Sequence, residues 1–425
     1  MRRKSDHHVR NATQNIAILL LVLSALVLLY ATGLPHTATM TQFFPSTSAS
    51  GTASTVEGTA APFPVRIASR SSSLLQAWPN ETTSDDVFSD FGTLLLDALH
   101  SSTDGQPIPE AEFQRALEND GIYYDFLNSL PLPVLERTLG GSGDAPHFSA
   151  RALLISVLQD KTLTLYAWDS ATDTYFCWQT DAPSSHLSQI MDRHKGIDAE
   201  FAFLCGEPYS ALHSYSLIPT EVVSMPALNQ TPVMNEALID TVLTQLEFNV
   251  HSQSRYPETN GTEVVVQGNR VIRFAPDGTI SYTGAEDSIP LLSVSRTEND
   301  DFQWQQIAAA QKLVSVLSGT QLGDLSLHLT ESHTTETTAE ISFDYQIGGY
   351  PLLFPEEHAA TVRIQNGSIT EFTLHLRSCT KSDNLSTLLP VLQAAAAAQS
   401  SRTCELFPGY YAENTSVLQP VWLSK

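Results

Sequence analysis

The sequence has none of the short motifs that mark the common enzyme and nucleotide-binding families. It contains no GxSxG, HExxH, GxGxxG or Walker A sequence, and no EF-hand calcium loop. The segment Gly140–Asp144 resembles a nucleophile or phosphate loop, but no strand with the required context leads into it and no lysine follows. We interpret it as a flexible loop. These absences predict a protein that is not an enzyme, with no catalytic residues and no bound cofactor.

Potential metal ligands also lack a recognisable spacing. His328, Glu331 and His333 are close in sequence, but their spacing fits no common ligand pattern of zinc. The acidic runs of the chain lack the regular oxygen-ligand spacing of a calcium loop. The sequence therefore predicts no metal site.

Basic residues are scarce. The 22 Lys and Arg are outnumbered by 46 Asp and Glu, which gives a formal net charge of −24. The segment before Pro35 carries four basic residues and one acidic residue, so the remainder of the chain is even more acidic. Such a surface repels nucleic acid and anionic lipid headgroups, while it permits attraction to a basic partner. We therefore expect no nucleic-acid partner.

Cysteine is rare as well, with 4 residues in the chain. Cys177 with Cys205, and Cys379 with Cys404, form two pairs that are close in sequence, at spacings that fit no zinc or redox motif. In an exported chain each pair can form a disulfide bond. The alternative is four buried free thiols, which pack as small apolar side chains. The sequence leaves both alternatives open.

One long apolar run, Ile16–Leu34, contains no charged residue. As a helix it is about 28 Å long, close to the roughly 30 Å hydrocarbon core of a bilayer. Several basic residues precede it, and none follows before Arg66. This asymmetry predicts a cytoplasmic tail over 1–15, a single transmembrane helix over 16–34 in the cell membrane, and an extracellular C-terminal part. The alternative is a cleaved secretory signal, which exports the same part of the chain.

Composition and turn signals divide the exported part. Residues 35–62 are rich in Thr, Ser, Ala, Gly and Pro and predict a flexible stalk. We place an N-terminal α+β domain at 63–225, a central α+β module at 226–300 and a C-terminal α+β module at 301–425. The first of these boundaries lies at Pro226–Pro232, which shows no hydrophobic periodicity. The predicted class is α+β, with antiparallel meander sheets and packed helices.

Hydrophobic periodicity predicts the elements of the first domain. Ser84 begins the clearest helix, because a capping residue and two acids precede an apolar stripe. The predicted helices are 84–98, 109–120, 133–139 and 184–194. The predicted strands are 65–68, 122–126, 152–158, 163–168, 175–178 and 201–204.

The two C-terminal modules share a helix-then-meander plan. Their first helices are predicted over 235–246 and 302–317. Asn366-Gly367 is the strongest hairpin signal, because both residues tolerate positive φ. The predicted strands are 262–267, 270–274, 279–283, 325–330, 338–347, 360–365 and 368–376. A last helix over 385–398, with a later start at Pro390 as the alternative, precedes an extended tail.

Three residues are candidates for contacts with a partner protein. Tyr256 and Tyr350 each lie next to a proline beside a predicted strand. They either pack over a sheet edge or form a contact surface, since a rigid tyrosine gives a large contact area at low entropy cost. Ser24 can donate a hydrogen bond to a partner helix in the membrane or to its own helix four residues earlier.

Several motifs resemble those of the YycH family. They are Phe248-Asn249, Ser254-Arg255-Tyr256, the run from Asn260 to Val266, the run from Arg273 to Tyr282, Gly349-Tyr350-Pro351 and the ending Leu418-Gln419-Pro420-Val421-Trp422. The layout is similar too, with one N-terminal membrane helix and a multi-part ectodomain whose later parts resemble the related YycI protein. The resemblance covers nearly the whole chain.

The resemblance implies a membrane-anchored regulator of an essential sensor histidine kinase that controls cell-wall metabolism in low-GC Gram-positive bacteria. It implies contacts with that kinase and with a YycI-like single-pass protein, and it supplies no catalytic residues. Two other hypotheses remain open. One is an anchored binding module for a cell-envelope ligand, which requires a deep pocket with convergent polar groups. The other is an exported enzyme with an unrecognised site.

Overall fold

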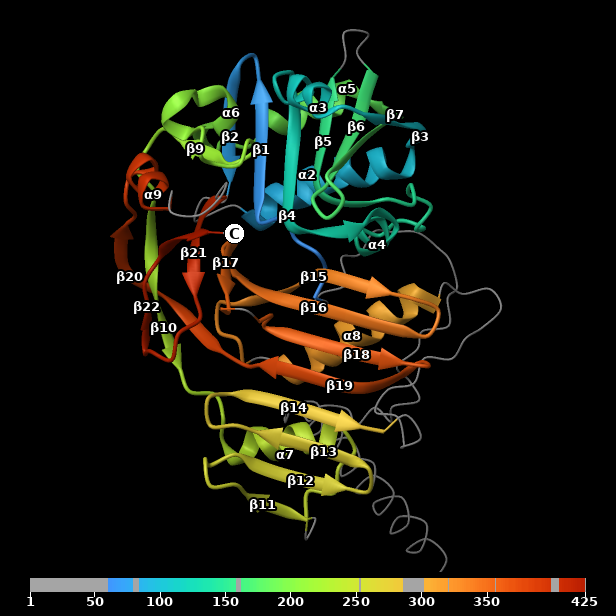
Figure 1. Ribbon diagram of the computed structural model, residues 1–425, viewed down its shortest axis with the longest axis vertical. Coiled ribbons are helices and arrows are strands. Elements are labelled where there is room, and N and C mark those ends of the chain that lie inside the picture. Colours follow the sequence, from blue (N-terminus) through green and yellow to red (C-terminus); the bar gives the residue numbers. More distant parts are fainter. Residues whose placement is uncertain are drawn as a thin grey trace, which may run out of the picture. The chain divides into compact units, whose positions relative to one another are not determined.

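The computed structural model describes residues 60–78, 84–157, 162–251, 254–285, 302–319, 321–355, 357–398 and 405–424 (Figure 1). All of them belong to one compact unit, Ser54–Lys425. The predicted tail, the predicted transmembrane helix with Ser24, and nearly all of the predicted stalk lie outside the described residues. Within the described part, no helix has both the length and the apolar character needed to cross a membrane.

The first part of the chain forms a nine-stranded sheet with the order β3-β7-β6-β5-β4-β1-β2-β8-β9. Its strands are β1 (Arg66–Ser71), β2 (Leu74–Trp78), β3 (Thr103–Ile108), β4 (Gly121–Pro131), β5 (Ser149–Val157), β6 (Thr162–Asp169), β7 (Thr174–Pro183), β8 (Ile197–Phe201) and β9 (Leu217–Pro219). The helices that accompany it are α2 (Ser84–His100), α3 (Glu110–Leu117), α4 (Leu132–Thr138), α5 (Ser184–Met191), α6 (Ala202–Cys205) and the 3-10 helix η2 (Glu207–Tyr209).

The centre of this sheet is buried on both faces. Successive strand residues point to opposite faces, so Tyr123 and Tyr124 of β4 enter different cores. On the Tyr124 face, α2 packs the apolar stripe that the sequence predicts, and its members are buried: Val87, Phe91, Leu94, Leu95 and Ala98. On the Tyr123 face, α3 inserts Phe113 among the rings of Tyr166, Tyr175 and Tyr215. This packing explains why β4, β5 and β6 consist of nearly continuous buried residues.

An eleven-stranded sheet follows, with the path β11-β12-β13-β14-β19-β18-β16-β17-β21-β23 and with β15 paired to β16. Its strands are β11 (Arg255–Pro257), β12 (Glu263–Gln267), β13 (Arg270–Phe274), β14 (Thr279–Gly284), β15 (Ser326–Thr334), β16 (Thr338–Ile347), β17 (Tyr350–Leu353), β18 (Ala360–Gln365), β19 (Ser368–His375), β21 (Leu406–Tyr411) and β23 (Val421–Ser424). The helices α7 (Glu236–Gln245) and α8 (Phe302–Ser318) lie over its strands in Figure 1.

Strands of both predicted C-terminal modules belong to this one sheet. β14 pairs antiparallel with β19, from Thr279 opposite His375 to Thr283 opposite Glu371. The predicted hairpin at Asn366-Gly367 is confirmed, since these residues adopt φ of 49° and 79° between β18 and β19. The ladders among the described strands are antiparallel apart from β17 with β21. The α+β class with mostly antiparallel sheets is therefore confirmed.

A three-stranded sheet includes most of Pro226–Pro232, the stretch without hydrophobic periodicity where we place a domain boundary. β10 (Ser224–Thr231) pairs on one side with β20 (Ser378–Thr387) and on the other with β22 (Val417–Leu418). Proline weakens the strand signal because it has no N–H for the ladder. The structure accommodates Pro226 where the register with β20 shifts.

One further element prediction is wrong, and one open alternative is decided. A strand is expected over 201–204. Of these residues only Phe201 belongs to a strand, as the last residue of β8, and Ala202–Cys205 forms the short helix α6. A short apolar run does not distinguish a buried strand from a buried helix by periodicity. The last helix, α9 (Val391–Ala398), follows Pro390, while the residues before it extend β20 to Thr387. The alternative start at Pro390 is therefore the right one.

We expect Gly278→Ala to lower the free energy of unfolding by about 2–3 kcal/mol, because a left-handed residue with a side chain is costly and this one also overpacks. Gly278 has a φ of 94°, and an added Cβ collides with the carbonyl oxygen of Leu376. Gly268→Ala is the control, since its φ is 61° but an added Cβ has open space. Urea denaturation of the two variants measures the difference. Equal losses of unfolding free energy in the two variants contradict the explanation by steric collision.

Candidate ligand cleft

Two arginines and two carboxylates form a buried charge cluster where β1, β4 and β5 meet the start of β21. Arg66 donates hydrogen bonds to Asp125 and Glu405, and Arg151 donates to the same two carboxylates. Their exposed fractions are 4% for Arg66, 0% for Asp125, 6% for Arg151 and 3% for Glu405. The charges balance two against two, which offsets the cost of removing them from water.

The charges of the cluster hold each other in the ionised state. Burial by itself raises the pKa of Asp125, but Arg151 and Arg66 hold it well below its usual range. Burial also acts to raise the pKa of Glu405, and Arg66 and Arg151 lower it below its ordinary value. In the opposite sense, burial lowers the pKa of Arg66, while Asp125 and Glu405 raise it above its ordinary value. All of these groups are therefore charged at neutral pH.

The buried charge cluster also shapes the strand beside it. Oδ1 of Asp125 accepts a hydrogen bond of 2.8 Å from the backbone N–H of Leu127. Leu127 has a φ of 65°, a conformation that is unfavourable for a leucine. The register between β4 and β5 shifts between Asp125 and Leu130, so the strand bulges here. The bulge places Leu127 and Asn128 at the wall of a cleft.

This cleft has a volume of about 710 Å³, within the roughly 300–1,000 Å³ typical of ligand pockets. Residues of β4, β15, β16, β17, β21 and β23 and of the loop after β17 line it. Four of the lining residues are acidic, Glu331, Asp344, Glu357 and Glu413, and His358 lies among them. No lysine or arginine is among the described residues that line the cleft.

His358 joins two of these acids. Its Nδ1 lies 2.9 Å from Oδ2 of Asp344 and its Nε2 lies 3.4 Å from Oε2 of Glu331. The hydrogen bonds to Asp344 and Glu331 outweigh burial and raise the pKa of His358 to about 10. The bond to His358, opposed by burial and aided by His333, lowers the pKa of Glu331 to about 2. His358 is therefore a cation at neutral pH, held by two carboxylates.

We expect His358→Gln to lower the free energy of unfolding at pH 7 by about 1.5 kcal/mol, the lower end for hydrogen bonds to charged groups because the ring is partly exposed. A raised pKa contributes stability that is complete below the ordinary value of 6.5 and is lost as the pH rises through about 10. The variant should therefore lose less stability than the parent between pH 7 and pH 10. Urea midpoints at both pH values test this.

His333→Gln is the matched control for that experiment. His333 contacts the same Glu331, at 2.8 Å, but its side chain is 74% exposed. We expect the control to unfold almost as the parent does. A parent chain whose stability does not change between pH 7 and pH 10 contradicts the assigned ion pairs of His358.

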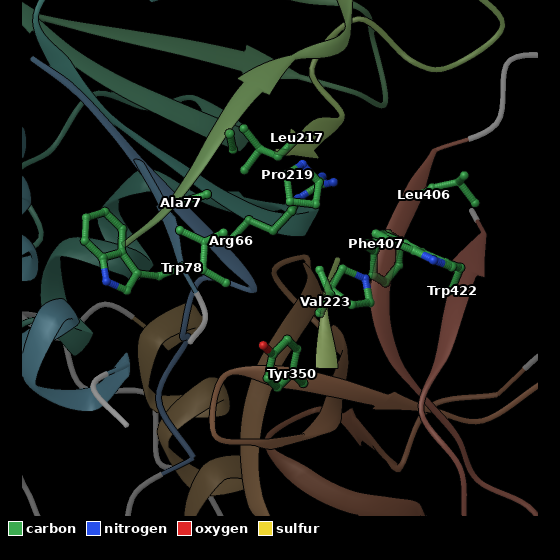
Figure 2. A pocket seen from close by; sticks show the side chains of 13 residues that line it. Arg66, Ala77, Trp78, Leu217, Pro219, Val223, Tyr350, Leu406, Phe407 and Trp422 are labelled. Atoms are coloured by element: carbon green, nitrogen blue, oxygen red, sulfur yellow. The ribbon is translucent and has the colours of Figure 1, made fainter. Parts of the chain in front are cut away.

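The two candidate contact tyrosines, Tyr256 and Tyr350, differ in their exposure. Tyr256 lies on the edge strand β11 and is 48% exposed, so its role as a partner contact stays a prediction. Tyr350 is only 4% exposed, which agrees with the alternative that it packs against the sheet rather than forming a contact surface. It lines a small pocket of about 50 Å³ together with Phe407 and Trp422 (Figure 2). Tyr350 belongs to a hydrophobic core cluster with members from distant parts of the chain, which the sequence pattern alone does not show.

Of the two alternatives left open by the sequence for Cys177 and Cys205, the structure has the free thiols rather than the disulfide bond. Both are free thiols, as is Cys379. Cys177 is buried on β7 and Cys205 ends α6. Burial raises the pKa of Cys379 to about 11, which keeps the thiol protonated. Cys404, the expected partner of Cys379, lies outside the described residues.

Of the three residues considered as metal ligands, two come together. His333 contacts Glu331, whereas His328 lies 3.0 Å from the carbonyl oxygen of Ala61. In the described ranges, no group of His, Cys, Asp and Glu has the arrangement of a metal site. Sequence reasoning missed Asp344 and His358 as parts of the site, since no short spacing connects them with Glu331.

No protein-family model and no curated protein sequence matches the chain. Among solved structures, the chain is similar to the crystal structure of YycH from Bacillus subtilis. The two are 10% identical with a TM-score of 0.57, over 87% of this chain and 94% of that chain. At this identity the likeness concerns the fold. The fold of this chain is therefore similar to that of YycH.

Proposed function

We propose that the protein is a non-enzymatic regulator that modulates a two-component sensor histidine kinase controlling cell-wall metabolism. In this proposal Ile16–Leu34 anchors it as a single-pass protein, with the N-terminus in the cytoplasm and the remainder outside. It contacts the kinase and a YycI-like single-pass protein through its membrane helix and its extracellular part. The observation that carries the proposal is the YycH-like fold over 87% of the chain, which agrees with the sequence motifs.

A regulator of this kind acts by differential binding. A kinase with two states shifts toward the state that the regulator binds more tightly, and every 1.4 kcal/mol of preference changes the ratio about tenfold. Such binding needs an exposed contact surface on the extracellular part rather than a reactive site. The regulator therefore needs no catalytic residue.

An apolar patch formed by Val222, Leu385, Leu389 and Leu392 is a suitable surface. These side chains are 53%, 60%, 56% and 47% exposed. They lie on adjoining segments, because Leu385 pairs with Pro226 next to the Val222 segment and Leu388 N–H bonds to the carbonyl of Val223. Exposed apolar residues that are grouped in this way are typical of protein contacts.

Membrane crosslinking and affinity capture of the full chain test the proposal. We expect recovery of a sensor histidine kinase and a second single-pass protein. The double substitution Leu385→Asp and Leu389→Asp should reduce recovery on the order of tenfold, because it places charges in the contact. Leu74→Asp is the control, since Leu74 is 50% exposed on a different strand. Capture without any histidine kinase contradicts the proposal.

The cleft supports a second candidate function, an anchored binding module for a cell-envelope ligand. Its volume of about 710 Å³ and its convergent acidic and imidazole side chains match what a ligand site requires. The two candidates are compatible in one protein if ligand binding alters the contact with the kinase.

A further inference from the structure

We propose that the cleft lined by Glu331, Asp344, Glu357 and Glu413 binds a short cationic peptide with two or more Lys or Arg side chains. The inference rests on the second candidate function, ligand binding, and it adds the chemical class of the ligand. It does not depend on contact with a kinase. Three independent features of the cleft carry it: its charge, an unpaired buried acceptor and its aromatic wall.

The charge of the cleft favours a cation. The described lining residues include four carboxylates, and His358 alone among them supplies a positive charge. His358 is already engaged by Asp344 and Glu331. The side chain of Glu357 is 61% exposed and lies 2.8 Å from Nε2 of His375, and Glu413 is exposed in the segment after β21. Carboxylates spread over several elements suit a ligand with more than one positive charge.

A buried acceptor in the cleft wall lacks a donor. Gln346 lines the cleft and is 2% exposed. Its Nε2 donates a 3.2 Å hydrogen bond to the carbonyl oxygen of Phe63, while its Oε1 has no hydrogen-bond partner within the described part of the chain. A buried acceptor without a donor is unfavourable, and buried polar groups are normally paired. If the Gln346 side chain turns toward the cleft, an ammonium, guanidinium or peptide N–H supplies the missing donor, whereas an anionic group does not.

The remaining wall is apolar and aromatic. The half-buried Leu353, Phe354 and Tyr411 line it, together with the buried Tyr345 and Pro351. Aromatic faces attract ammonium and guanidinium groups, and apolar surface accommodates the aliphatic stems of Lys and Arg. A peptide that alternates basic and apolar side chains satisfies the acidic and the apolar walls together. A polyamine offers charges and methylene groups only, so we expect it to bind more weakly.

Fluorescence anisotropy of a labelled, end-blocked peptide Lys-Leu-Lys-Leu-Lys with the purified full chain in detergent tests the proposal. We expect saturable binding that weakens as salt is added, because exposed charges contribute to it. Unlabelled Lys-Leu-Lys-Leu-Lys should displace the probe, spermine should displace it less effectively, and Glu-Leu-Glu-Leu-Glu should not displace it. Displacement by spermine at equal or lower concentration overturns the assignment to a peptide.

Paired variants locate the binding site. The double substitution Glu357→Gln and Glu413→Gln should weaken binding on the order of tenfold, since it removes two charges that face the ligand. Glu118→Gln with Glu336→Gln removes the same charge from exposed positions outside the cleft and should leave affinity unchanged. Equal losses in both pairs show non-specific attraction and overturn the proposal.

Two outcomes separate this inference from the function on which it rests. Binding of a neutral or acidic probe, abolished by Gln346→Leu, overturns the cationic class while ligand binding in the cleft remains. Absence of binding by cationic, neutral and acidic peptides alike overturns both the inference and the second candidate function for peptide ligands.

Discussion

Asp125→Ala is expected to lower the free energy of unfolding by about 3–5 kcal/mol, the range for breaking a buried ion pair from one side. The substitution leaves Arg66 and Arg151 with Glu405 as their shared carboxylate, in a site where each is at most 6% exposed. It also removes the acceptor for the N–H of Leu127, which holds an unfavourable positive φ. The loss of unfolding free energy therefore has two causes: a buried positive charge without its full set of partners, and a bulge at Leu127 that is no longer held by its hydrogen bond.

Urea denaturation of the full chain measures this loss, and Glu371→Ala provides the matched control. Glu371 also pairs with an arginine, Arg363, but the two side chains are 45% and 49% exposed. Exposed ion pairs contribute about 0–1 kcal/mol, so the control should unfold close to the parent. If both substitutions have the same effect, Asp125 does not stabilise the fold in the way the geometry indicates.

The same residue should make the fold sensitive to acid. Asp125 and Glu405 have pKa values below their ordinary values of 3.8 and 4.5. Their contribution to stability is complete above these ordinary values, and it is lost as the pH falls below about 4 toward the lower folded-state values. Asp125→Ala should therefore flatten the decline of stability between neutral pH and acid. An unchanged decline contradicts this account.

Under the proposed function, replacing Ile16–Leu34 with an unrelated apolar helix of equal length is expected to abolish regulation of the kinase while export continues. Export depends on hydrophobicity and on flanking positive charge, which the replacement retains. Association between membrane helices depends instead on close packing at small residues, and the segment contains five: Ala17, Ser24, Ala25, Ala31 and Gly33. An unrelated helix lacks this arrangement.

A reporter gene controlled by the kinase measures regulation, and labelling of the chain from outside intact cells measures export. Ser24→Ala is a milder companion, because interhelical hydrogen bonds average only about 0.6 kcal/mol. If regulation persists with the unrelated helix, the membrane segment acts as an anchor and the extracellular part carries the contact. In that case Leu385→Asp with Leu389→Asp should remove regulation instead.

Several elements were predictable because their causes are local. The sequence of α2 has acidic residues next to Ser84 and then an apolar stripe, and the β18–β19 hairpin depends on Asn366-Gly367. Asn235 caps α7 by accepting a hydrogen bond from the N–H of Leu238, three residues later. β10 was missed because what stabilises it is distant in sequence, in β20 and β22.

Composition and short-range pattern were enough to predict the α+β class, most helices and strands, and the acidic character, and they show no familiar catalytic motif. Which charged residues meet could be seen only in the folded chain. Arg66 and Glu405 are 339 positions apart, and no spacing rule connects Glu331 with His358. Register and sheet packing bring these residues together, bury Tyr350 in the hydrophobic core and form the acidic cleft. None of this is visible in the sequence, because long-range contacts have no signature in neighbouring residues.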